Sequence, residues 1–204
     1  MPKREDQNTD RARQMVAQEA ARLIVDGGMR DYRAAKIKAA ERLGLRSRGS
    51  LPGNAEIEAA VGEHHKIFGG DEHALFLAAM RETALAAMQL LSDFEPRLVG
   101  PVLAGTADDH SAVNLHVFAD SPETVAFALA DQGLQYRPYE RRLKTRQGQP
   151  EVYAGFRFRH ADATVEATVF PYDGIRQAPI SPIDGRPMRR ADARAVLDLL
   201  GRDA

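Results

Sequence analysis

Three polar side chains and one glycine-threonine pair are the residues of this chain whose types and spacing suit phosphate chemistry. Asn114 and His116 lie two positions apart in an alternating segment, so both project from the side opposite its apolar residues. Glu166 has the same kind of position in a second alternating segment. In the pair Gly105-Thr106, glycine lets the backbone approach a phosphate group, and the hydroxyl and the following amides can donate to phosphate oxygens. If the two alternating segments are neighbouring strands, the three polar side chains converge on one side of a sheet.

The order of these residues resembles the DNA polymerase β-type nucleotidyltransferase superfamily. Its members place Gly-Ser at the start of a helix after one strand, Asp-x-Asp on the next strand, and a third carboxylate on a neighbouring strand. The resemblance implies that Thr106 stands for the serine, Asn114 and His116 for the two aspartates, and Glu166 for the third carboxylate. It also implies that residues 114, 116 and 166 occupy the catalytic positions, and that Gly105 and Thr106 bind the nucleotide phosphates.

The ligand types at these positions are poor for magnesium. Mg²⁺ prefers carboxylate, phosphate and water oxygens, whereas Asn114 offers one neutral oxygen and His116 an imidazole. We therefore expect that ordinary two-metal transfer is lost, and that Mg²⁺ or Mn²⁺ is a cofactor only if transfer activity survives. A metal site formed by His116 and Glu166 with a softer ion such as Mn²⁺ or Zn²⁺ is the open alternative.

A closing segment adds candidate anion ligands. The chain resembles a group of proteobacterial proteins that share its Val-Asn-Leu-His strand and the Ser-Pro-x-Asp-Gly-Arg-Pro-Met segment at 181–188. Arg186 and Arg190 lie in or just after this segment and are candidates for phosphate binding. The alternative is that they only keep an irregular segment soluble.

A second basic region lies near the N-terminus. Residues 30–48 contain seven Lys or Arg against two acids, and seven minus two gives a net charge of +5. Such a cluster is typical of a polyanion-binding surface, although an ordinary solvated helix face has the same composition. The nucleic-acid-binding candidates are Arg30, Arg33, Lys36, Lys38, Arg42, Arg46 and Arg48.

The first 95 residues have the spacing of helices separated by glycines. Asp31 is a plausible cap for a helix over 32–43, and Asn54 and Asp71 for two later helices. From Arg97 the pattern changes to strands and helices. The apolar run 98–103 reads as a first strand, Ser121-Pro122 begins a helix, and residues 136–144 and 152–170 read as antiparallel strands with a turn near 160–163.

These elements predict an α+β fold with a three- or four-stranded mixed sheet. The expected organisation is a helical N-terminal region at 1–95, followed by a nucleotidyltransferase-like domain at 96–204 that ends in a loop and a helix over 191–200.

Composition limits the remaining possibilities. With 204 residues, 44% apolar residues and a formal net charge of −1, the chain can bury a sizeable core. No segment approaches the roughly 18 apolar residues of a membrane span. The sequence contains no cysteine, which excludes disulfides and thiolate chemistry. We expect a soluble, cytoplasmic protein without a membrane partner.

Three functional hypotheses follow from the sequence. The favoured one is a nucleotidyltransferase-like protein that binds a nucleotide or RNA without transferring a nucleotidyl group. The second is an active enzyme that transfers a nucleoside monophosphate to RNA, protein or a small molecule. The third is a non-enzymatic module that interacts with nucleic acid or protein through the basic helix 30–48.

Overall fold

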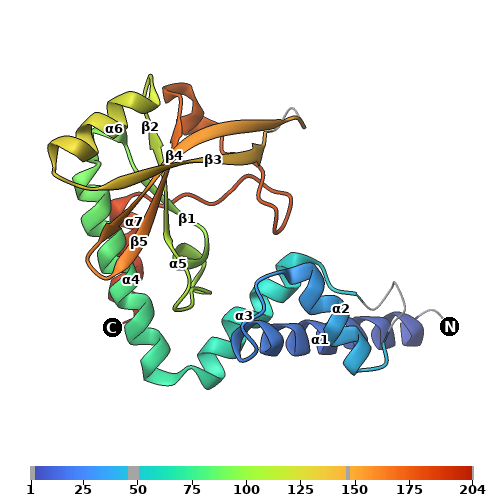
Figure 1. Ribbon diagram of the computed structural model, residues 1–204. Coiled ribbons are helices and arrows are strands. Elements are labelled where there is room, and N and C mark those ends of the chain that lie inside the picture. Colours follow the sequence, from blue (N-terminus) through green and yellow to red (C-terminus); the bar gives the residue numbers. More distant parts are fainter. Residues whose placement is uncertain (1–2, 46–50, 146–147, 204) are drawn as a thin grey trace. The chain divides into compact units, whose positions relative to one another are not determined.

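The computed structural model describes residues 3–45, 51–145 and 148–203 (Figure 1). The chain forms two compact units. The first comprises the chain up to Gly70 together with Pro182–Asp184, and the second comprises Asp71–Ser181 and the chain from Gly185 onward. The division falls one helix earlier than the predicted boundary between residues 95 and 96.

The first unit is helical. Its helices are α1 (Lys3–Val25), α2 (Tyr32–Arg42) and α3 (Asn54–Phe68). Asp31 caps α2 as predicted, because its side chain accepts a hydrogen bond of 2.7 Å from the backbone N–H of Arg33. The unit has its own apolar core, which includes Val16, Ala20, Ala39, Ile57 and Val61.

The second unit contains a mixed sheet, and the predicted α+β class is confirmed. Its strands are β1 (Arg97–Val99), β2 (Val113–Phe118), β3 (Tyr136–Lys144), β4 (Pro150–His160) and β5 (Ala163–Phe170). They lie in the order β1-β2-β5-β4-β3. Strands β2 and β5 are parallel, and the other three neighbouring pairs are antiparallel. The described residues therefore form five strands, one or two more than predicted, and the three-residue β1 lies at one edge of the sheet.

Helices complete the second unit. They are α4 (Gly70–Leu90), α5 (Pro101–Ala104), α6 (Pro122–Asp131) and α7 (Ala193–Asp203), with short 3-10 turns at Ser92–Phe94 and Tyr172–Arg176. Helix α6 begins directly after Ser121 with Pro122 in its first turn, as the sequence predicts. The start of α4 within this unit explains the earlier domain boundary, since Leu77, Met80 and Met88 on α4 belong to the core of the sheet.

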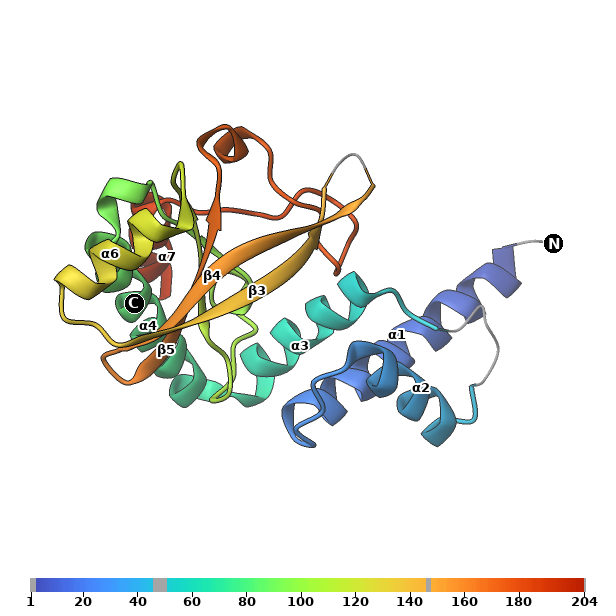
Figure 2. The ribbon, with the colours of Figure 1, turned by 45° about the horizontal axis from the view of Figure 1, so that its top comes forward.

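One face of the sheet forms this core. Val113, Leu115 and Val117 of β2 point to the same side as Val165, Ala167 and Val169 of β5, and all six are buried in one cluster with residues of α4, α6 and α7. Figure 2 shows these helices gathered beside the strands. Because side chains alternate along a strand, Asn114, His116 and Glu166 are left on the opposite face.

The first strand is shorter than its apolar sequence indicates. It ends at Val99, and Gly100 turns the chain with a positive φ of 74° before Pro101 opens α5. Proline suits the first turn of a helix, where its missing N–H costs no hydrogen bond. The prediction of strand structure up to Leu103 was therefore wrong. No helix in the described part of the chain is long and apolar enough to cross a membrane.

Candidate functional site on the polar face of the sheet

The parallel pairing of β2 and β5 brings the three predicted central positions onto one surface. Asn114 lies opposite Glu166, and His116 lies opposite Thr168. Residues two apart on a strand share a face, so these four side chains form a block on the side away from the helices. Glu166 is 8% exposed and His116 only 1% exposed. The convergence that the alternating segments indicate is therefore present.

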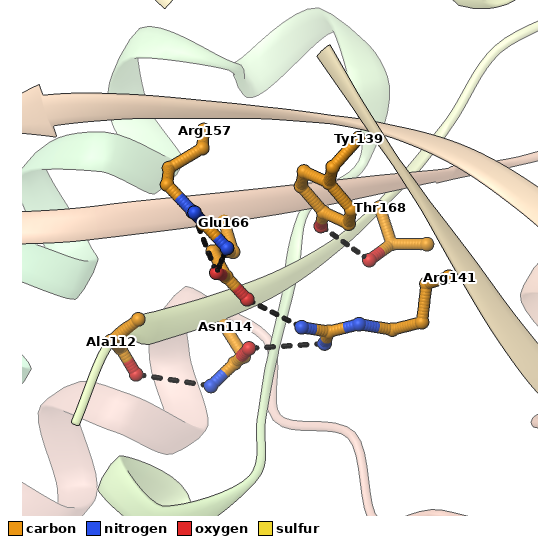
Figure 3. A network of polar contacts seen from close by, with 7 residues as sticks. All are labelled: Ala112, Asn114, Tyr139, Arg141, Arg157, Glu166 and Thr168. Carbon is orange, nitrogen blue, oxygen red and sulfur yellow. Dashed lines mark hydrogen bonds and ion pairs between the residues drawn. The ribbon is translucent and has the colours of Figure 1, made fainter. Parts of the chain in front are cut away.

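An arginine that was not predicted bridges Asn114 and Glu166 (Figure 3). Arg141 of β3 donates from Nη1 to Asn114 Oδ1 at 3.1 Å and from Nη2 to Glu166 Oε2. On the other side of the carboxylate, Arg157 of β4 donates to Glu166 Oε1 from Nε at 2.9 Å and from Nη2 at 2.6 Å. Both oxygens of the carboxylate are thus bound by guanidinium groups, which are strong charge-assisted donors.

Tyr139 supports this network from β3. Its ring crosses Gly155 of β4, and its hydroxyl is hydrogen-bonded to Thr168 Oγ1 at 2.8 Å (Figure 3). The guanidinium carbons of Arg141 and Arg157 lie 5.4 and 5.9 Å from the centre of the ring, within the range of cation–π attraction. Burial raises the pKa of the Tyr139 hydroxyl. The phenol is therefore a neutral support for two fixed cations.

His116 is bound by a different arginine. Arg190 donates from Nε to His116 Nδ1 at 3.0 Å and from Nη1 to the backbone carbonyls of Gly174 and Ile175. Its guanidinium also lies 5.0 Å from the ring centre of Phe118 and 5.1 Å from that of Phe170. Burial, followed by the nearby charge of Arg97, lowers the pKa of Arg190 to about 10. Arg190 was predicted to bind phosphate; the contacts of its Nε and Nη1 anchor the C-terminal segment to the sheet.

These contacts fix the protonation state of His116. A guanidinium only donates hydrogen bonds, so Nδ1 must be the acceptor and the ring proton is on Nε2. Burial lowers the pKa of His116 well below its ordinary value, and the charges of Arg190 and Arg141 lower it further. His116 is therefore a neutral, buried structural residue.

The structure does not form the metal site expected from His116 and Glu166. Glu166 has both oxygens engaged by arginines, and Nδ1 of His116 accepts from Arg190. Throughout the described residues, no group of three or more His, Cys, Asp or Glu side chains is arranged to hold a metal ion. A divalent ion shared by residues 114 and 166 would have to displace Arg141.

The resemblance implies that Gly105-Thr106 begins a helix, and this prediction was also wrong. Gly105 follows α5 as its C-cap with a φ of 81°, and the backbone N–H of Thr106 donates to the carbonyl of Pro101. The pair therefore ends a helix, where carbonyls point outward, and does not begin one. The glycine that precedes α5 is Gly100, where an added Cβ would lie 3.4 Å from Asn114 Nδ2. Its successor Pro101 supplies neither a hydroxyl nor a backbone N–H that could donate to a phosphate oxygen.

The remaining predicted cationic residues are spread over the two units. Arg186 is exposed in the loop before Arg190. On α2 and just before it, Arg30, Arg33, Lys38 and Arg42 are exposed, Arg42 forms an ion pair of 3.0 Å with Glu19, and Lys36 donates to the carbonyl of Pro52. Arg46 and Arg48 lie outside the described residues. Two of these basic side chains thus have structural contacts within the helical unit.

Comparison with known proteins gives no family assignment. Searches against family models, curated proteins and solved structures found no match. Function is therefore inferred from the side chains of the site, since a fold class by itself specifies no chemistry.

The residues that sequence reasoning missed are Arg141, Arg157, Tyr139 and Thr168. The alternation of Arg157 and Arg159 with Phe156 and Phe158 was a visible signal that both arginines share the polar face. Arg141 gave no comparable signal, because its contact with Glu166 depends on the order of the strands and crosses the whole width of β4.

Proposed function

We propose that the sheet unit is a nucleotidyltransferase-like domain that binds the phosphate groups of a nucleotide or RNA without metal-dependent transfer. The observation that carries the proposal is the contact of Arg141 with both Asn114 and Glu166. A fixed positive charge lies between the two positions that would share a metal ion in the superfamily the sequence resembles. Such a site attracts phosphate through guanidinium groups, which match phosphate oxygens well.

Three features support this proposal. Residues 114 and 166 are direct neighbours on parallel strands, which matches the order of positions implied by the resemblance. The carboxylate is neutralised by two arginines, so it is not available to activate a hydroxyl or hold Mg²⁺. The side chain of Arg157 is 54% exposed, which leaves part of its guanidinium accessible to a ligand.

Calorimetry on the full chain tests the binding. ATP, CTP, GTP, UTP and a short single-stranded RNA are titrated in EDTA and again in Mg²⁺. We expect at least one to bind in EDTA, with no gain in affinity from Mg²⁺, and Arg141→Gln to weaken that binding at least tenfold. Arg142→Gln is the matched control, because Arg142 is exposed on the same strand and faces the other side of the sheet.

A transfer assay distinguishes the proposal from active catalysis. The chain is incubated with α-labelled nucleotides and cell extract. We expect that no acceptor carries a label that is lost when Glu166→Gln replaces the parent chain. Mg²⁺-dependent labelling that disappears in Glu166→Gln would establish an active transferase and refute the proposal. Flat titrations with every nucleotide and with RNA would refute it as well.

A further inference from the structure

A groove lined by three arginines lies at one end of strands β3, β4 and β5. It has a volume of about 570 Å³, and its lining includes Arg137, Arg157 and Arg159 together with Gln135 and Thr164. All three arginines are exposed. This size is within the range of ordinary small-ligand sites, which is roughly 300 to 1,000 Å³. We call it the arginine groove.

The strand register places like charges against one another in this groove. Arg137 of β3 lies directly opposite Arg157 of β4, and Arg159 follows two residues later on the same face. Like charges directly opposite across two strands destabilise a sheet. A bound anion between these arginines would remove that cost.

The protein's own carboxylates do not balance the positive charge on this face of the sheet. On the Glu166 side of β3, β4 and β5, all within described residues, four arginines stand against two glutamates, and four minus two leaves an excess of two positive charges. Glu166 is shared by Arg141 and Arg157, and Glu151 lies near the opposite end of β4, where it accepts a hydrogen bond from Tyr153. Arg159 is held by the backbone carbonyl of Asp162 at 3.0 Å.

We propose that the arginine groove binds a chain of adjacent phosphoryl groups. Neighbouring strands lie about 4.8 Å apart, and residues two apart on a strand are separated by roughly 6.7 Å. The three guanidinium groups therefore span more than one phosphate group, and their N–H donors that are not engaged by Glu166 or Asp162 can bind phosphate oxygens. Gln135 and Thr164 add neutral donors at the rim.

The source of the phosphoryl groups is either the triphosphate of a nucleotide or successive phosphates of an RNA strand. Phosphate binding in the groove is inferred from Arg137, Arg157 and Arg159 alone. That the natural ligand is a nucleotide or RNA rests on the proposed function. Inorganic tripolyphosphate is therefore the primary probe, with ATP, adenosine and a ten-nucleotide RNA bearing a 5′-hydroxyl as the other arms.

Binding is measured by calorimetry in EDTA at 50 mM and 200 mM salt, with the full chain and with Arg137→Gln, Arg159→Gln and the double variant. We expect tripolyphosphate to bind and the double variant to weaken it at least tenfold, with Arg142→Gln unchanged. Because Arg137 and Arg159 are exposed, we expect these variants to keep the circular dichroism spectrum of the parent chain.

Binding should weaken as salt rises, and ATP should bind while adenosine does not if the source is a nucleotide. RNA should bind more tightly and with a steeper salt dependence if the source is RNA.

Each outcome separates this proposal from the preceding one. Failure of tripolyphosphate to bind, or equal binding by the double variant, overturns the arginine groove as a phosphate site. Binding of nucleotide or RNA that is lost in Arg141→Gln but unchanged in the double variant overturns the groove and leaves the proposed function intact. Binding of tripolyphosphate without any nucleotide or RNA supports the groove and overturns the proposed function.

Discussion

Arg190 donates a hydrogen bond from Nε to Nδ1 of His116 at 3.0 Å, and this contact determines which ring nitrogen of a buried histidine carries the proton. The position of His116 is the one where the superfamily resemblance implies a metal-binding aspartate. A neutral imidazole that accepts from an arginine instead packs within the protein. The centroid of the His116 ring also lies 4.4 Å from the centroid of the Phe170 ring. The C-terminal segment that carries Arg190 is thereby joined to β2.

The first prediction concerns the pH dependence of stability. Above the ordinary histidine pKa of 6.5, His116 is neutral in both the folded and unfolded chain. Below it, the unfolded chain takes up a proton and the folded chain does not, because burial and the neighbouring arginines hold the folded pKa well below 6.5. The free energy of unfolding should therefore fall with decreasing pH, by up to about 1.4 kcal/mol per pH unit, until the folded pKa is reached.

Urea denaturation between pH 7.5 and 5.0 measures this dependence in the parent chain and in His116→Asn. The asparagine side chain does not titrate, and its oxygen can accept from Arg190 in place of Nδ1. The difference in unfolding free energy between the two proteins should be constant above pH 6.5 and should change below it. Parallel curves over the whole range would show that His116 does not have a depressed pKa.

Local features of the fold were predictable from sequence because their causes are local. The bounds of β3, Tyr136–Lys144, match the predicted segment, and the start of α6 follows from Ser121 and Pro122. The position of Pro101 was misread because an apolar run before it resembles a strand, whereas Gly100 turns the chain at that point. The apolar spacing of α4 revealed a helix but not which of the two cores it joins.

The site was predictable only in part, because some of its contacts depend on the order of the strands and not on local sequence. Alternation placed Asn114 and Glu166 on polar faces of their strands, and the parallel pairing then makes them neighbours. Arg141 comes from a strand two places away from β5 in the sheet, so its contact depends on tertiary strand order. That contact puts a guanidinium against both residues that the resemblance assigns to a metal ion.

The second prediction concerns the carboxylate itself. Glu166→Gln removes the shared partner of Arg141 and Arg157 and leaves their positive charges facing one another. We expect a loss of about 2 kcal/mol in the free energy of unfolding, less than for a fully buried pair because Arg157 is half exposed. Inorganic phosphate should recover more stability in this variant than in the parent chain, because the anion replaces the missing charge. Thermal denaturation with and without phosphate measures both effects, and equal stabilisation of the two proteins would contradict the expectation.

The third prediction concerns metal binding. It tests whether the lack of a carboxylate at residue 114 or the presence of Arg141 prevents it. Asn114→Asp alone should bind Mn²⁺ poorly, because the new carboxylate would pair with Arg141. The double variant Asn114→Asp with Arg141→Gln places two carboxylates at opposed positions on neighbouring strands without a guanidinium between them. Its affinity for Mn²⁺ should be at least tenfold higher than that of Asn114→Asp, as measured by calorimetry. Equal affinities would show that Arg141 does not occupy the metal position.

The last prediction concerns the glycine beneath Tyr139. Gly155 lies opposite Tyr139 on one side and opposite Thr168 on the other, so the ring must pass over residue 155 to reach its hydrogen-bond partner. A Cβ at this position would overlap the Cζ atom of the ring. Gly155→Ala should therefore push the ring aside, break the bond to Thr168 and lower the free energy of unfolding by about 2 kcal/mol.

A double-mutant cycle tests whether this cost arises from the ring. In a Tyr139→Ala background the alanine at 155 has no ring to displace, so its cost should fall to a small fraction of the value in the parent chain. Because Arg141 and Arg157 both lie over the ring, Gly155→Ala should also weaken phosphate binding. Urea denaturation and phosphate titration of the four proteins measure both consequences. Equal destabilisation by Gly155→Ala in the two backgrounds would instead place the cost in the backbone of β4, because only that contribution survives removal of the ring.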